Sequence, residues 1–359
     1  MQDTRVVEVV SIVKPPPPAP VKRRTFTTKD LLVLGGSAAS SLALTWLLYS
    51  QMLPFSGLQG FLLFWAGTFL GMYYTSVREL DNAVVAKDRA MAALIAIVAV
   101  ALMIPLALIV IYVTVKGAQY VRLAFFTTDM ETVSPTAPPQ ETGGLASLVG
   151  TFEQVGIAML VSVPLGVLTA VYLNEVGGRL RRPVRIFVDA MSGVPSIVAG
   201  LFIYSVLVVN TTFSGFAAAL ALSILMLPTV TRTCEVVLRL VPDGLREASL
   251  AMGSPEWRTV SRVVLPTARS GVITAIILGV ARVVGETAPL IMTAFGNPVT
   301  NLNPFNGAQA ALPLSAFRAF GGTPQDVERA WVFAFVLLAI VLILFVSARW
   351  MARRSVLNR

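Results

Sequence analysis

The chain alternates between long apolar runs and short polar segments, and the apolar runs define its architecture. Each run is close to the roughly 20 residues that a helix needs to cross a bilayer. Residues 190–231 contain no charged residue, but turn-forming residues at 210–215 divide this stretch into two runs. The eight runs lie at about residues 31–50, 57–77, 90–115, 146–173, 187–209, 213–231, 270–294 and 330–349. The pattern predicts an all-α polytopic membrane protein with about eight spans.

The composition agrees with a membrane protein and excludes several kinds of catalytic site. Hydrophobic residues make up 55% of the chain and charged residues 13%, and the mean hydropathy is +0.76. Soluble domains carry about 25% charged residues. The sequence has no histidine, one cysteine (Cys234) and no Gly-Lys-Ser or Gly-Lys-Thr. It therefore predicts no metal site, no internal disulfide, no bound cofactor and no ATP hydrolysis or other enzymatic activity by this chain itself.

The positive charge of the chain predicts its orientation in the membrane. A net charge of +9 in a soluble protein would suggest nucleic acid as a partner, but here the basic residues lie in short loops between apolar runs. With a cytoplasmic N-terminus, 23 of the 28 Lys and Arg residues fall in cytoplasmic segments and Arg282 falls within a span. Because basic loops stay in the cytoplasm, both termini are predicted to be cytoplasmic. The positive charge is thereby explained by topology, and no nucleic-acid partner is predicted.

The N-terminal part precedes the rest of the chain as a separate region. Residues 1–30 are polar and contain four consecutive prolines, which predicts a disordered cytoplasmic tail. The apolar run at 31–50 is longer than that of a signal peptide, and the next run, 57–77, follows at once. Both are predicted to be transmembrane helices. The Gly67-x-x-x-Gly71 pattern favours ordinary packing over a specific helix contact.

The loop at 232–269 contains nearly forty residues without an apolar span, and a loop of this length usually has a function. Its sequence predicts one helix capped by Asp243, a left-handed turn at Gly253, and a second helix capped by Ser254 with Pro255 at its first position. Such a charged helical hairpin is typical of a docking element. A solvated pair of helices at the membrane surface is the alternative.

The run at 270–294 carries two ionisable residues, Arg282 and Glu286. An unpaired Arg in the middle of a membrane costs at least about 2.5 kcal/mol. Residues four apart share one face of a helix, so the two can form an ion pair that binds this helix to its neighbours. Alternatively they line a pathway, where the guanidinium fork suits an oxyanion. Pro289 predicts a kink or break in the outer half of the helix.

A second proline-containing segment begins the run at 187–209. Ser192 and Ser196 flank the sequence Gly193-Val194-Pro195. An unwound helix at this point would present both hydroxyl groups as hydrogen-bonding partners, while a kink that serves only packing fits the sequence equally well.

Three motifs in this chain resemble those of a known transporter family. Glu-Ala-Ser at 247–249 is followed after three residues by Gly253, and after nine more residues by Val263-x-Leu265-Pro266. This spacing resembles the cytoplasmic signature of permease subunits of ATP-binding-cassette importers. The runs at 281–290 and 193–202 are similar to those of PstA-type permeases of bacterial phosphate importers. The similarity covers about residues 91–349 and does not extend to the first 80.

The resemblance implies an importer-permease (MetI-like) fold with six core helices at 90–350 and two additional N-terminal transmembrane helices at 31–77. It implies that the cytoplasmic loop 232–269 holds a coupling helix that lies in a groove of a separate ATPase subunit. Ser249 stands where the family pattern has a second alanine. The residues expected to carry the coupling are Glu247, Ala248, Ser249, Gly253, Leu265 and Pro266.

The resemblance further implies a permease for inorganic phosphate in the bacterial inner membrane. The residues expected to line the pathway are Arg282, Glu286, Ser192 and Ser196. The implied partners are a second, PstC-type permease subunit, two ATPase subunits that hydrolyse ATP, membrane lipid, and an external phosphate-binding protein. External segments 116–145 and 295–329 are candidate contacts for this binding protein, and loops that merely connect the spans fit them equally well. The alternatives are a permease for sulfate, molybdate or phosphonate and, from another class, an ion-coupled secondary transporter or channel that needs no ATPase.

Overall fold

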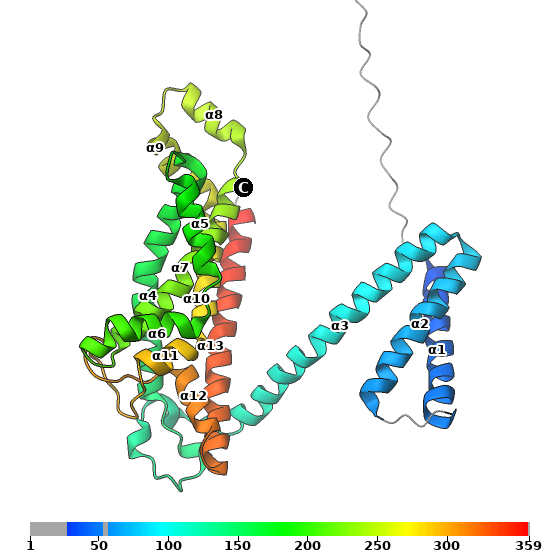
Figure 1. The fold of residues 1–359 in the computed structure, drawn as a ribbon, viewed down its shortest axis with the longest axis horizontal. Coiled ribbons are helices and arrows are strands. Elements are labelled where there is room, and N and C mark those ends of the chain that lie inside the picture. Colours follow the sequence, from blue (N-terminus) through cyan, green and yellow to red (C-terminus); the bar gives the residue numbers. More distant parts are fainter. Residues whose placement is uncertain (1–26, 53–56, 358–359) are drawn as a thin grey trace, which may run out of the picture. The chain divides into compact units, whose positions relative to one another are not determined.

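The computed structural model describes residues 27–52 and 57–357, which form helices and connecting loops without any β-strand. The all-α prediction is therefore confirmed for this part of the chain. The chain divides into two compact units, residues 1–106 and 107–359 (Figure 1). The tail predicted at residues 1–30 lies outside the described residues, except for residues 27–30 at the start of the first helix.

The N-terminal unit is a helical hairpin followed by the first part of a third helix. Asp30 defines where the first helix begins, because its carboxylate accepts hydrogen bonds from the backbone N–H and the hydroxyl of Thr27, both at 2.9 Å. Asp30 also pairs with Arg89 of the third helix at 2.7 Å. A buried carboxylate needs such partners, and this one joins two helices of the unit. The elements are α1 (Thr28–Thr45), the π-helical turn η1 (Trp46–Met52), α2 (Leu58–Leu80) and α3 (Ala83–Ala118).

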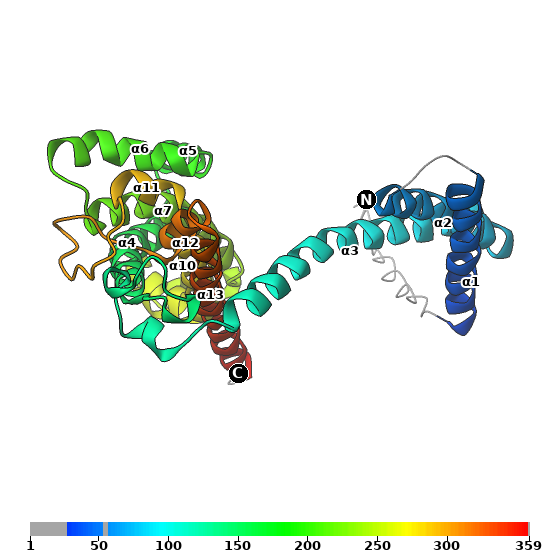
Figure 2. The ribbon, with the colours of Figure 1, turned by 90° about the horizontal axis from the view of Figure 1, so that it is seen from below.

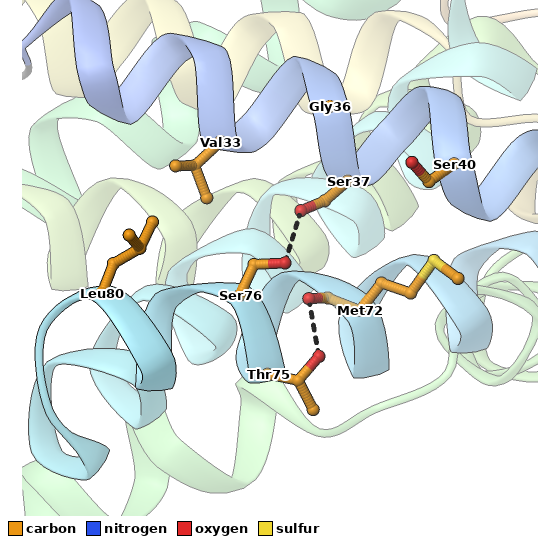
Figure 3. Close-up of a pocket in the computed structure, with 8 residues that line it drawn as sticks. All are labelled: Val33, Gly36, Ser37, Ser40, Met72, Thr75, Ser76 and Leu80. Carbon is orange, nitrogen blue, oxygen red and sulfur yellow. Dashed lines mark hydrogen bonds between the residues drawn. The ribbon is translucent and has the colours of Figure 1, made fainter.

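A pocket of about 420 Å³ lies between α1 and α2 (Figure 3). It is lined by Val33, Gly36, Ser37, Ser40, Met72, Thr75, Ser76 and Leu80. The Ser37 hydroxyl donates to that of Ser76 across it at 3.5 Å, and the lining includes no charged residue. Gly67 and Gly71 point away from other elements, since a Cβ on either would meet no atom within 4 Å. The Gly-x-x-x-Gly pattern therefore makes no helix contact in the described part of this unit.

The C-terminal unit is a helical bundle in which α7 packs against α4, α5, α6, α10 and α11 (Figures 1 and 2). The last helix, α13, packs against α10 and α12. Within the described residues its α-helices are α4 (Leu145–Val171), α5 (Arg181–Ser192), α6 (Ser196–Val206), α7 (Gly215–Arg239), α8 (Asp243–Ala251), α9 (Glu256–Thr259), α10 (Leu265–Val284), α11 (Ala288–Thr293), α12 (Leu312–Phe320) and α13 (Pro324–Leu357).

Small residues let the central helices of this bundle approach closely. Val230 of α7 lies between Gly166 of α4 and Gly279 of α10. A Cβ on Gly166 would come within 3.0 Å of a Val230 methyl group, and a Cβ on Gly279 within 2.7 Å. In a bilayer the lipid tails are as apolar as the side chains, so close van der Waals packing of this kind stabilises helix association.

The number of spans differs from the eight predicted. Six helices among the described residues are long and apolar enough to cross a membrane, and a bent pair adds a seventh if it counts as one span. The bent pair is α5 with the stretch Ser196–Asn210, which meet at 104°. The predicted run at 187–209 is therefore two helices. α2 has 23 residues but is not among the six, because aromatic, glycine and polar residues dilute its apolar character.

The predicted separation between the cytoplasmic hairpin and the span at 270–294 is wrong. Helical structure continues from Glu256 to Val284 without a break at the basic residues around 269. A π-helical turn, η7 (Val260–Val264), ends two residues before Pro266. Pro266 has no N–H to donate to the preceding turn, and the wider π turn accommodates this missing hydrogen bond while the helix continues.

Candidate functional site

Two helix breaks, distant in sequence, come together in the C-terminal unit. α6 packs against α11, and both helices begin directly after a break (Figure 2). Gly200 of α6 faces Pro289 of α11 so closely that a Cβ on Gly200 would lie 2.6 Å from the Pro289 Cα. Only glycine permits this approach of two backbones. The motifs at 193–202 and 281–290 therefore form one structural centre.

The break after α10 separates the two ionisable residues of this region. α10 ends at Val284, Glu286 lies in the non-helical link, and α11 begins at Ala288. The predicted break is confirmed, but it falls before Pro289, which occupies the first turn of α11. The expectation that Arg282 and Glu286 share one helical face is therefore wrong. Within the described residues they form no ion pair.

Arg282 lies in the last turn of α10 with its side chain exposed. One of its Nη groups donates to the hydroxyl of Thr229 in α7 at 2.9 Å. This is the only hydrogen bond of the Arg282 side chain among the described residues. The half-buried Glu286 side chain, in contrast, has no hydrogen-bond partner among the described residues. The break thus presents a guanidinium with unused donors and a carboxylate with unused acceptors.

The two serines of the other break differ in their contacts. Ser192 ends α5, and its hydroxyl donates to the carbonyl of Val188 at 3.0 Å. Ser196 begins α6, is half-buried, and has no side-chain hydrogen bond among the described residues. The predicted unwinding between them is confirmed, since the link at 193–195 is not helical. Their contact with a transported solute stays a prediction.

The hairpin that the sequence predicts to be cytoplasmic consists of α8, a tight turn and α9. Gly253 has a φ of 80°, the left-handed conformation that glycine adopts without strain, so the predicted turn is confirmed. Ser249 is buried, and its hydroxyl lies 2.8 Å from that of Thr259. The serine that replaces the second alanine of the family pattern therefore joins the two arms of the hairpin.

The predicted caps of the two hairpin helices are wrong by one residue. Pro242 and Pro255, not Asp243 and Ser254, occupy the cap positions. Each proline has a φ near that of a helix and an extended ψ, so its ring prepares the chain to enter the helix in the next residue. Asp243 is then free to pair with Arg246 at 3.0 Å.

The hairpin presents large apolar side chains to solvent. Met252 is 81% exposed and Trp257 64% exposed, and Leu245 and Leu250 are also exposed. Glu247 and Ala248 lie exposed on the same helix as the leucines, and Pro266 is exposed in the first turn of α10. Exposed apolar side chains in a polar loop are typical of an interaction surface.

Arg246 anchors the hairpin to the bundle. Its guanidinium donates to both carboxylate oxygens of Glu175, at 2.8 and 3.0 Å, in the bidentate arrangement that makes such pairs strong. It also donates to the carbonyl of Leu238 in the last turn of α7 and to that of Val241, two residues beyond the helix. The hydrogen bond with Glu175 raises the pKa of the Arg246 guanidinium above its ordinary value. The pair is not evident from the sequence, because its members are 71 residues apart.

Glu235 of α7 is a buried carboxylate that accepts from three arginines. Arg185 of α5 lies 2.6 Å away, Arg232 2.9 Å and Arg239 2.5 Å. Arg232 pairs in addition with Asp189 of α5. A buried charge is tolerated only with such partners, so this cluster holds α5 on α7. Along the sequence these arginines indicate only the orientation of the chain, because their shared partner cannot be recognised there.

The family model of the binding-protein-dependent transport system inner membrane component matches residues 162–356, more than half of the chain. The chain belongs to this family. It is thus a multi-pass inner-membrane transport component, and every candidate residue described above lies within the matched residues.

Several curated relatives carry the same description, phosphate transport system permease protein. The PstA 1 protein of Mycobacterium tuberculosis (strain CDC 1551 / Oshkosh) is 46% identical over 57% of this chain and 69% of its own length. PstA of Mycobacterium leprae is 39% identical over 67% of this chain and 80% of its own. PstA of Pasteurella multocida is 36% identical over 65% and 83%. The resemblance to PstA-type permeases is thereby confirmed.

Among solved structures, a chain of the MetNI methionine ABC transporter in an inward-facing conformation is similar to 58% of this chain. The match covers 92% of that chain, with 22% identity and a TM-score of 0.47. At this score the assignment to the transport-component family depends on the sequence matches.

Proposed function

We propose that this protein is a transmembrane subunit of an ATP-driven importer of inorganic phosphate. The observation that carries the proposal is its identity of 39% over 245 residues to a protein named as a phosphate transport system permease, together with the match to the transport-component family. The chain forms the translocation pathway with a second, PstC-type permease subunit. It binds no cofactor, and ATP is hydrolysed by a separate pair of ATPase subunits.

The cytoplasmic hairpin docks into the ATPase. The exposed apolar side chains of Met252 and Trp257 support this role, because they leave water when a partner covers them. Glu247 and Ala248 are exposed beside them. Movement of the ATPase reaches the bundle through Arg246, which joins the hairpin to Glu175 beside the end of α4 and to the end of α7.

Arg282 binds the phosphate ion on its way through the bundle. Its guanidinium has donors left after the bond to Thr229, and their planar geometry matches two phosphate oxygens. Glu286, Ser192 and Ser196 at the adjacent breaks complete the pathway. Transport requires that the ion binds the outward-open and inward-open states differently, and a break beside the site allows the backbone to rearrange between them.

The segments at 116–145 and 295–329 face the exterior and receive the phosphate-binding protein, and both termini are cytoplasmic. The hydrogen bonds that fix the conformation of the second segment support this role. Gln309 donates to Glu153 of α4 at 2.5 Å and to the carbonyl of Asn301 at 2.9 Å, and accepts from Gln154 at 3.0 Å. These bonds hold an extended loop against α4 and give a partner a defined surface.

The test is uptake of radiolabelled phosphate by vesicles that contain the complete complex. ATP is supplied or omitted on the side of the membrane where the ATPase subunits lie. We expect uptake that requires ATP and that excess sulfate or molybdate leaves unchanged. Inhibition by sulfate or molybdate would assign the permease to another oxyanion. Uptake without ATP would contradict the coupling role of the hairpin and favour a secondary transporter or channel.

A further inference from the structure

Three arginines at the start of α5 have no carboxylate partner among the described residues: Arg179 just before the helix, and Arg181 and Arg182 in its first turn. Arg179, Arg181 and Arg182 are exposed and form no ion pair among the described residues. Together with Gly178 and Arg185 they line a pocket of about 460 Å³, whose lining contains no acidic residue. The excess of unpaired positive charge is confined to this pocket, because the neighbouring arginines have partners. Arg185, Arg232, Arg239 and Arg246 all pair with carboxylates.

The backbone explains why the three arginines gather at one point. Gly177 and Gly178 have φ values of 71° and 90°, which reverse the chain after the π-helical turn η5 (Tyr172–Val176). The N–H of Arg181 then donates to the carbonyl of Gly178 at 3.2 Å, and α5 begins. The nearest acidic groups are already engaged, Glu175 with Arg246 and Asp189 with Arg232.

Large apolar side chains flank this basic pocket. Val176 is 62% exposed, Leu180 64%, Ile186 58% and Phe187 64%. α5 has 12 residues, too few to cross a bilayer by itself, and combines two arginines in its first turn with this apolar surface. Basic residues beside exposed apolar side chains on an amphipathic helix are typical of a segment at the boundary between headgroups and acyl chains.

We propose that the basic pocket of Arg179, Arg181 and Arg182 binds the phosphate group of an anionic phospholipid in the cytoplasmic leaflet. The proposal rests on the cytoplasmic placement of this segment in the proposed function. Guanidinium groups form charge-assisted bonds to any phosphate group, so a free phosphate ion offers the same chemistry. The exposed apolar flank favours the lipid, because acyl chains cover Leu180 and Phe187 whereas a free ion leaves them in water.

The experiment is photo-crosslinking of the purified complete complex in lipid nanodiscs, without ATP. The probes are photoactivatable phosphatidylglycerol and, in parallel, photoactivatable phosphatidylcholine, and the labelled peptides are mapped by mass spectrometry. We expect phosphatidylglycerol to label residues 176–192 in preference to phosphatidylcholine. Because each arginine near an anionic membrane surface strengthens binding about fivefold, the double variant Arg181→Gln/Arg182→Gln reduces this labelling about thirtyfold.

A matched control separates the pocket from general surface charge. Arg78→Gln/Lys87→Gln removes the same charge from exposed residues of the N-terminal unit, on the side predicted to be cytoplasmic, and leaves labelling of 176–192 unchanged. Co-purification of the ATPase reports whether each variant assembles, and Arg179→Gln replaces the double variant if that one does not. Equal labelling by the two lipids, or unchanged labelling in the arginine variants, would overturn the proposal.

A third arm distinguishes the lipid from the free ion. Excess inorganic phosphate during crosslinking leaves the labelling by phosphatidylglycerol in place if the lipid is the ligand. Displacement of the lipid at phosphate concentrations that leave labelling elsewhere intact would assign the pocket to free phosphate and overturn the lipid proposal. Because crosslinking requires no transport, a negative result leaves the phosphate-importer proposal standing, and failure of uptake leaves this test interpretable.

Discussion

Arg282 combines an exposed guanidinium with a single hydrogen-bond partner in the described residues, the Thr229 hydroxyl. It is therefore not a member of a buried ion pair whose loss would destabilise the bundle. This geometry favours a role in binding over a role in packing. It does not support the interpretation that Arg282 and Glu286 form an ion pair with each other.

The first prediction concerns Arg282→Ala. We expect ATP-dependent phosphate uptake to fall to background while the complex still assembles, because the side chain makes one hydrogen bond to the bundle but supplies the charge for the anion. Uptake into vesicles and co-purification of the ATPase measure the two effects. Arg349→Ala, at an exposed position of α13, is the control with the same charge change. Normal uptake by an assembled Arg282→Ala complex would contradict the proposed pathway.

The second prediction concerns Gly200. A methyl group at this position meets the backbone of Pro289 at 2.6 Å, so Gly200→Ala forces α6 away from α11. Overpacking of this kind costs about 1–3 kcal/mol. We expect a lower thermal unfolding temperature of the purified protein and reduced uptake. At Gly193, in the neighbouring break, the nearest atom to an added Cβ is 3.5 Å away, and Gly193→Ala should therefore have little effect on stability.

At the scale of elements, the hairpin of α8 and α9 has two faces that carry different residues, and we propose a separate role for each. Its outer face carries the exposed apolar side chains, and its inner face carries Arg246 and Ser249. Substitutions on the two faces should therefore fail in different ways.

On the outer face we predict that Trp257→Ala weakens binding of the ATPase. Truncation of a central aromatic residue in an interface costs about 2 kcal/mol or more, which corresponds to roughly thirtyfold in affinity. Titration of the ATPase against the reconstituted permease measures this, and circular dichroism checks that the helices remain. Ser261→Ala, at an exposed polar position in η7, is the control. Unchanged affinity in the Trp257 variant would show that the ATPase binds elsewhere.

On the inner face we predict that Arg246→Ala lowers stability and uncouples ATP hydrolysis from uptake. The substitution leaves the Glu175 carboxylate, 6% exposed, without its charged partner and with only the Asn174 amide as a donor, which costs roughly 3 kcal/mol. The thermal unfolding temperature and the ratio of ATP hydrolysed to phosphate imported are the measurements. Asp243→Ala removes only the 89% exposed partner of Arg246, and pairs of this kind contribute about 1 kcal/mol or less. A coupled, stable Arg246→Ala complex would refute the role of this anchor.

At the scale of the whole molecule, the distribution of Lys and Arg predicts that the hairpin is cytoplasmic and that the segment at 295–329 is external. Cys234 is the chain's only cysteine and is fully buried, so it contributes little background to thiol labelling. In intact cells a membrane-impermeant maleimide should label Asn303→Cys, whereas Ser261→Cys should react only after the membrane is opened. The reverse pattern would invert the proposed topology.

The sequence by itself determined the helical class, the position of most spans, the helical hairpin with its glycine turn, and the presence of breaks near Pro195 and Pro289. These features are local. The length of an apolar run, the missing N–H of proline and the left-handed conformation of Gly253 act within a few residues, so they can be recognised along the chain.

Only the tertiary structure decided how these elements come together. The pair of Arg246 with Glu175 and the contact of Gly200 with Pro289 join residues far apart in sequence. The chain contains many other arginines, glutamates, glycines and prolines, so the sequence does not show which of them pair. The separation of Arg282 from Glu286 depends on where α10 ends. That point is determined by Pro289 together with the packing of α11 against α6 and α7. Long-range packing has no periodic signal, and the geometry of the site is therefore a property of the folded chain.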